Sequence, residues 1–87
     1  MVKVEIYTAM ACPFCTRAVK LLSVKNINFK EIDVTLSSTK RQMMRNRSNG
    51  RTSVPQVFIN DDHIGGWEDL LRFDRAGGLD KLLSVVT

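Results

Sequence analysis

Long apolar runs are absent from this sequence of 87 residues. A helix that spans a bilayer needs roughly 20 consecutive apolar residues, and no stretch comes near that length. Residues 1–7 also lack the apolar core that a secretory signal peptide requires. We therefore expect a protein that has no membrane partner, is not secreted and works in the cytoplasm.

Cysteine is scarce as well, because Cys12 and Cys15 are the only two in the chain. Small secreted domains that are stapled by disulfides carry several cysteines along their length, so this class is excluded. In a reducing compartment, a pair at this spacing is more often catalytic than structural. A structural zinc site needs four ligands, and His63 is the only histidine available to join the pair, so we predict no metal site.

Internal repeats, low-complexity stretches and linkers are missing too. The length suits a single domain over residues 1–87, and we expect it to be a monomer. The net charge is +4, and basic residues gather in the segment 40–51, which favours anionic ligands or partners. That segment lacks interleaved aromatic residues, so we predict no nucleic-acid binding.

Hydrophobic periodicity predicts the order βαβα for the first half of the chain. Apolar residues at every second position predict a strand that ends near Thr8, and helical spacing predicts a helix from Pro13 to about residue 26. Residues 28–34 are typical of a second strand. Residues 39–42 fit a capping box for a helix that ends at residues 49–50, with Met43 expected to pack inside and Met44 at the surface.

The second half predicts a hairpin followed by two helices. Residues 56–59 and 63–65 are expected to be strands joined by a turn at 60–62. Residues 67–73 and a segment from Leu79 to Val86 have helical spacing. Strands joined through a helix run parallel and hairpin strands run antiparallel. The expected fold is α/β, a mixed four-stranded sheet flanked by helices in the order βαβαββαα.

The position of Cys12 favours a thiolate. It follows the first strand and is the expected N-cap of the first helix, where it faces unpaired N–H groups and the positive end of the helix dipole. The thiolate is the nucleophile of thiol–disulfide exchange. Cys15 lies one turn further, close enough to attack Cys12 when Cys12 is held in a mixed disulfide. We predict that Cys12 attacks and that Cys15 resolves.

Three separated motifs resemble the dithiol glutaredoxins of the thioredoxin fold over nearly the whole chain: Cys12-Pro13-Phe14-Cys15, Ser53-Val54-Pro55 and Gly65-Gly66-Trp67-Glu68-Asp69. The resemblance implies a glutathione-dependent disulfide oxidoreductase that reduces protein disulfides and glutathionylated proteins, with ribonucleotide reductase among the acceptors. Glutathione is then a co-substrate, and no cofactor is held tightly. The alternative hypothesis is a [2Fe–2S] cluster-binding module, although the family's cluster binders usually have Gly or Ser where Pro13 stands.

The resemblance also implies where glutathione binds. It implies a cis peptide bond before Pro55, so that the backbone of Val54 pairs with the peptide-like ligand as an added strand. It further implies that the helix after the two glycines holds the γ-glutamyl carboxylate at its N-terminus. The implied glutathione-binding residues are Phe14, Ser53, Val54, Pro55, Gly66, Trp67, Glu68 and Asp69.

Two positions depart from the family pattern. A lysine that pairs with a glutathione carboxylate is common where Ala9 stands, and we hypothesise that Arg41 or Arg51 supplies this charge. Position 67 is often small or Cys in the family, and Trp67 is expected either to shape the groove or to cover the helix. His63 is expected to be a solvated hairpin residue.

Overall fold

The computed structural model describes residues 2–85. Its strands are Val4–Thr8 (β1), Lys30–Asp33 (β2), Gln56–Ile59 (β3) and Asp62–Gly65 (β4). Its helices are Pro13–Val24 (α1), Ser38–Arg47 (α2), Trp67–Arg75 (α3) and Gly78–Val85 (α4). The order βαβαββαα confirms the prediction, while Val86, which was predicted in the last helix, lies outside the described residues.

The sheet has the strand order β2-β1-β3-β4, so β1 and β3 are the inner strands. β1 runs parallel to β2 and antiparallel to β3, and Ile6 is opposite Glu31 on one side and Val57 on the other. The hairpin between β3 and β4 turns at Asn60 and Asp61, whose φ angles are 50° and 70°. Asn and Asp tolerate this left-handed conformation better than most residues. The mixed four-stranded sheet is as predicted.

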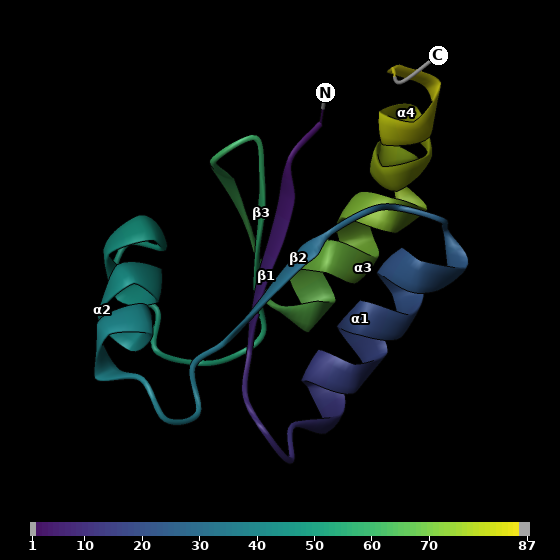
Figure 1. Cartoon of the computed structure of the whole chain (residues 1–87). Helices are drawn as coiled ribbons and strands as arrows, with labels where there is room; N and C mark the ends of the chain where they lie inside the picture. Colours follow the sequence, from purple (N-terminus) through teal and green to yellow (C-terminus); the bar gives the residue numbers. More distant parts are fainter. Residues whose placement is uncertain (1, 86–87) are drawn as a thin grey trace.

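Helices cover both faces of the sheet, with α2 on one face and α1 and α3 on the other (Figure 1). Two buried clusters fill the space between these layers. The larger one includes Ile6, Leu22, Val57, Leu70 and Leu79. The smaller one consists of Tyr7, Val34, Met44 and Phe58. None of the helices within residues 2–85 is long and apolar enough to cross a membrane.

Helix α2 corrects two details of the sequence interpretation. It begins at Ser38, and the side chain of Ser37 caps it by accepting a hydrogen bond from the N–H of Lys40 at 3.1 Å, so the predicted capping box at 39–42 does not start the helix. Met44 is 1% exposed and Met43 is 52% exposed, the reverse of the prediction. Met44 is the only buried residue that the structure records in α2, so the helix has no apolar stripe that could have distinguished the two methionines.

Arg47, near the end of α2, fastens the helix to the sheet. Its guanidinium donates to Oε1 of Glu5 at 2.8 Å and to the hydroxyl of Tyr7 at 3.0 Å. The same group lies 4.1 Å from the ring centroid of Phe58. An arginine that is both paired and stacked on an aromatic ring is well suited to a partly buried position. Helix α2 is therefore held against the sheet by the buried side chain of Met44 and by the hydrogen-bonded guanidinium of Arg47.

Candidate active site

Cys12 lies between the end of β1 and the start of α1. Its backbone is extended, with φ −115° and ψ 101°, and it caps α1, which begins at Pro13 as predicted. Its Sγ accepts a hydrogen bond from the N–H of Cys15 at 3.2 Å and, as a thiol, donates to the carbonyl oxygen of Val54 at 3.8 Å. A backbone N–H that points at the sulfur stabilises a negative charge there.

Cys15 has a different environment from Cys12. Its side chain is 4% exposed, whereas Cys12 is half-buried, and both thiols are free. Burial, followed by the hydrogen bond with Cys12, raises the pKa of the Cys15 thiol from 9.0 to about 12. Cys15 is therefore protonated at neutral pH and shielded from external reagents. Of the two thiols, that of Cys12 is the more accessible to a substrate.

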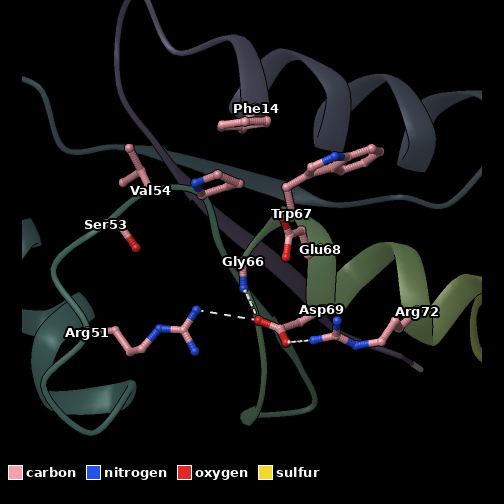
Figure 2. Close-up of a pocket in the computed structure, with 10 residues that line it drawn as sticks. Phe14, Arg51, Ser53, Val54, Gly66, Trp67, Glu68, Asp69 and Arg72 are labelled. Atoms are coloured by element: carbon pink, nitrogen blue, oxygen red, sulfur yellow. Dashed lines mark hydrogen bonds and ion pairs between the residues drawn. The ribbon is translucent and has the colours of Figure 1, made fainter.

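A hollow opens beside Cys12, between α1, the segment 51–55 and the start of α3 (Figure 2). The structure brings all eight residues of the implied glutathione site into its lining and adds two arginines. The complete lining is Phe14, Arg51, Ser53, Val54, Pro55, Gly66, Trp67, Glu68, Asp69 and Arg72. Arg72 was missed by the sequence interpretation, because an arginine on an exposed helix face carries no signal of its own.

The hollow has an apolar side and a charged side. Figure 2 shows Phe14, Val54 and Trp67 along one side, and Arg51, Asp69 and Arg72 along the other. The peptide bond between Val54 and Pro55 is cis, as the resemblance implied. Trp67 lines the hollow, as the first of its two expected roles requires, and it also packs against the larger core.

Asp69 organises the charged side. One of its oxygens accepts a hydrogen bond from the N–H of Gly66 at 3.0 Å and faces Nη2 of Arg51 at 3.4 Å. The other oxygen pairs with Nη2 of Arg72 at 2.6 Å. The Gly66 N–H, followed by the two guanidinium groups, holds the pKa of the Asp69 carboxyl below its usual value of 3.8. Asp69 therefore caps α3 and holds two cations at the mouth of the hollow.

The buried side chain of Gln56 supports the segment before Pro55 from behind. Its Nε2 donates to the carbonyl oxygen of Ser53 at 3.0 Å, and its Oε1 lies 2.6 Å from Nε2 of His63. Because the amide nitrogen of Gln56 is committed to Ser53, its oxygen must accept, and Nε2 of His63 carries the hydrogen. Sequence reasoning missed Gln56, which reads as an ordinary polar strand residue.

His63 was expected to be solvated, and this expectation is wrong. Its side chain is half-buried, hydrogen-bonded to Gln56 and stacked on Phe58, with ring centroids 5.0 Å apart. Burial, followed by the positive charge of Arg51, lowers the pKa of His63 below 6.5. The reason for the error is that β4 tucks this side chain against the inner strand β3, which the alternation of a four-residue strand does not reveal.

Arg51 and Arg41 were the two candidates to replace the lysine that is common in the family where Ala9 stands. Arg51 lines the hollow, and Arg41 is not among its lining residues. Within residues 2–85, no three His, Cys, Asp or Glu side chains gather in a way that could hold a metal ion. The thiol of Cys12 lies beside a hollow whose lining carries two arginines, and this arrangement suits thiol exchange with a partly anionic ligand.

Comparison with known proteins agrees with this geometry. Residues 4–64 match the Glutaredoxin family model. The chain is 52% identical to Glutaredoxin 3 of Escherichia coli strain K12 over 95% of its own length and 99% of that protein. It is 48% identical to a probable glutaredoxin of Synechocystis sp., over 93% of its length and 92% of that protein. The solution structure of glutaredoxin from Brucella melitensis superposes with a TM-score of 0.82 at 42% identity, over 100% of this chain and 94% of the other.

Proposed function

Because the chain belongs to the glutaredoxin family of glutathione-dependent thiol–disulfide oxidoreductases, we propose that Cys12 is its nucleophile and Cys15 its resolving thiol. The contrast between the two sulfurs carries this assignment. The sulfur of Cys12 is half-buried and accepts the N–H of Cys15, whereas the thiol of Cys15 is 4% exposed. An attacking thiol needs both stabilisation of its anion and access to the substrate, and Cys12 has both.

The reaction proceeds by two exchanges. The Cys12 thiolate attacks one sulfur of the substrate disulfide, the Cys12–substrate bond forms, and the other sulfur leaves as a thiolate and takes up a proton. Cys15 then loses its proton and attacks Cys12, which releases the bound half as a thiol and leaves a Cys12–Cys15 disulfide. Two glutathiones reduce this disulfide and become glutathione disulfide. For a glutathione mixed disulfide, a second glutathione can replace Cys15 in the resolving step.

Glutathione binds in the hollow beside Cys12. The backbone of Val54 pairs with the tripeptide, and the first N–H groups of α3 receive its γ-glutamyl carboxylate. Phe14, Pro55 and Trp67 contact its apolar parts, while Ser53, Gly66, Glu68 and Asp69 complete the site. Arg51 pairs with the glycyl carboxylate of glutathione and so replaces the lysine that is common in the family where Ala9 stands. The support for this binding mode is that the hollow brings these residues together around two cations next to the reactive sulfur.

Glutathione acts as a co-substrate, and the protein holds no cofactor tightly. Its acceptors are protein disulfides and glutathionylated proteins, ribonucleotide reductase among them. It works in the cytoplasm as a single-domain monomer, without nucleic-acid or membrane partners. Glutaredoxins have potentials of roughly −200 to −230 mV, close to that of the cytosolic glutathione pool, so the direction of exchange follows the state of the pool.

The test is the glutathione-dependent reduction of a small mixed disulfide, coupled to glutathione reductase. We expect Cys12→Ser to abolish the activity and Cys15→Ser to retain it, because glutathione can replace Cys15 with this substrate. Reduction of a protein disulfide should be lost in both variants. Activity in Cys12→Ser would overturn the assignment. An inactive wild type that is brown after anaerobic purification would favour the [2Fe–2S] alternative.

A further inference from the structure

A second hollow lies on the other side of Cys15. Its lining includes Thr8 from β1, Cys15 and Lys20 from α1, and Glu31 from β2. It shares no lining residue with the hollow beside Cys12. Glutathione in the first hollow therefore leaves the second one open. Glu31 has no part in the two thiol exchanges proposed above.

Glu31 is placed on the sheet face that α1 covers. In the parallel register of β1 and β2 it is opposite Ile6, which belongs to the core beneath α1. The hydroxyl of Thr8 donates to Oε2 of Glu31 at 2.8 Å, and Thr8 is 3% exposed. One carboxylate oxygen of this solvent-exposed side chain is thus anchored to the buried Thr8, and the side chain lines the hollow that Cys15 also lines.

The resolving step has a proton to remove. Cys15 must become a thiolate to attack Cys12, yet burial raises the pKa of its thiol well above neutral pH. Its burial also limits the access of bulk hydroxide and buffer bases to the sulfur. Among the residues that line this hollow, Glu31 is the one with a carboxylate that can accept a proton. The other charged group that lines this hollow, Lys20, is a cation and cannot do so at neutral pH.

We propose that Glu31 accepts the proton of Cys15 while Cys15 resolves the mixed disulfide. The inference rests on the proposed function, which makes Cys15 the resolving thiol. In the balanced step, the proton passes from the Cys15 thiol across the hollow to the carboxylate of Glu31. The Cys15 sulfur then bonds to the Cys12 sulfur, and the bond between Cys12 and glutathione breaks. Glutathione leaves as a thiolate, and Glu31 returns its proton to solvent.

Electrostatics alone predicts the opposite effect of removing this carboxylate. The negative charge of Glu31 contributes to the raised pKa of Cys15, so Glu31→Gln should lower that pKa and speed resolution if charge were its only influence. A proton acceptor predicts slower resolution in the same variant. Glutamine keeps an oxygen that can accept from Thr8, so the substitution removes the basicity of the side chain while conserving its shape and its anchor. The direction of the rate change therefore decides between the two roles.

The experiment mixes the reduced protein with a glutathionylated peptide, quenches with acid and measures by mass the mixed disulfide at Cys12 and the Cys12–Cys15 disulfide over time. In Glu31→Gln we expect the mixed disulfide to form at the wild-type rate and to resolve about tenfold more slowly or worse, since general base catalysis typically contributes 10² to 10⁴. The resolution rate should also rise more steeply with pH, because hydroxide then replaces Glu31. Glu31→Asp should recover part of the rate.

Asp62→Asn is the matched control, because it removes an exposed carboxylate from β4 that does not line the hollow. Resolution in Glu31→Gln at the wild-type rate or faster would overturn the inference about Glu31. The same experiment on Cys15→Ser tests whether Cys15 is the resolving thiol, since this variant should stop at the mixed disulfide. If Cys15→Ser does not accumulate the mixed disulfide, the proposed function fails. If it does and Glu31→Gln is not slowed, only the role of Glu31 fails.

Discussion

Nε2 of His63 lies 2.6 Å from Oε1 of Gln56, and this hydrogen bond joins β4 to the start of β3. The same side-chain amide is bonded to the segment before Pro55, because its nitrogen donates to the carbonyl oxygen of Ser53 at 3.0 Å. The side chain of Gln56, which makes both hydrogen bonds, is fully buried. The position of the edge that Val54 presents to glutathione therefore depends on two side chains that do not themselves line the hollow.

Gln56→Leu should raise the KM for glutathione several-fold and change kcat much less. The substitution frees the Ser53 carbonyl but leaves Cys12 and its cap intact. It should also destabilise the protein by about 1–3 kcal/mol, since it removes two hydrogen bonds of about 0.5–1.5 kcal/mol each. Steady-state kinetics and urea unfolding measure the two effects. Gln42→Leu, at an exposed position on α2, is the control and should leave KM unchanged. An unaltered KM in Gln56→Leu would contradict the supporting role.

The stability of the protein should fall as the pH drops from about 7.5 to 5.5. The pKa of His63 in the folded protein is below its usual 6.5, so the unfolded chain binds this proton more readily. The contribution of His63 is thus fully present above pH 6.5 and is lost as the pH falls through and below that value. Urea unfolding at several pH values measures the slope. His63→Gln keeps a donor for Gln56 and should flatten the slope, whereas an unchanged slope would assign it to other groups.

The sequence alone predicts the framework because its signals are local. Alternation, a proline at a helix start and the two cysteines at the junction of strand and helix define β1, α1 and the reactive sulfurs. The contacts that join distant segments leave no such trace. Gln56 and His63 read as ordinary hairpin residues, Arg72 as an exposed helix residue, and Met43 and Met44 as interchangeable, because each role depends on which face of the sheet a neighbouring element covers.

Arg51→Gln should weaken glutathione binding more than Arg41→Gln does. Arg51 lines the hollow beside Asp69, and Arg41 does not line it. We expect a several-fold higher KM for glutathione in Arg51→Gln and a smaller sensitivity of KM to added salt, since part of the charge attraction is gone. Arg41→Gln removes the same charge from the chain and serves as the control. Equal effects of the two substitutions would mean that general charge steering, and not a contact at Arg51, draws glutathione in.

Gly65→Ala should disturb the glutathione site through Asp69. Gly65 has a φ of +123°, and a Cβ there would lie 2.6 Å from Cγ of Asp69. The carboxylate would have to leave the N–H of Gly66, so we expect both a higher KM for glutathione and lower stability. Gly77→Ala is the control, because its φ is +86° but no atom lies within 4 Å of the added Cβ. Gly77→Ala should lower stability alone, and a normal KM in Gly65→Ala would contradict the expected displacement of Asp69.

The thin attachment of α2 has a consequence for local unfolding. A helix that buries one methionine and is held by one arginine can detach from the sheet at a lower free energy than α1, which buries Cys15, Ala18 and Leu22. Its amide hydrogens should then exchange with deuterium before those of α1, and Arg47→Met should widen the difference. The segment 51–55 follows α2 directly, so each detachment would free one end of that segment while Gln56 still holds the other. The edge that Val54 presents to glutathione is thereby joined to a helix that opens more readily than α1.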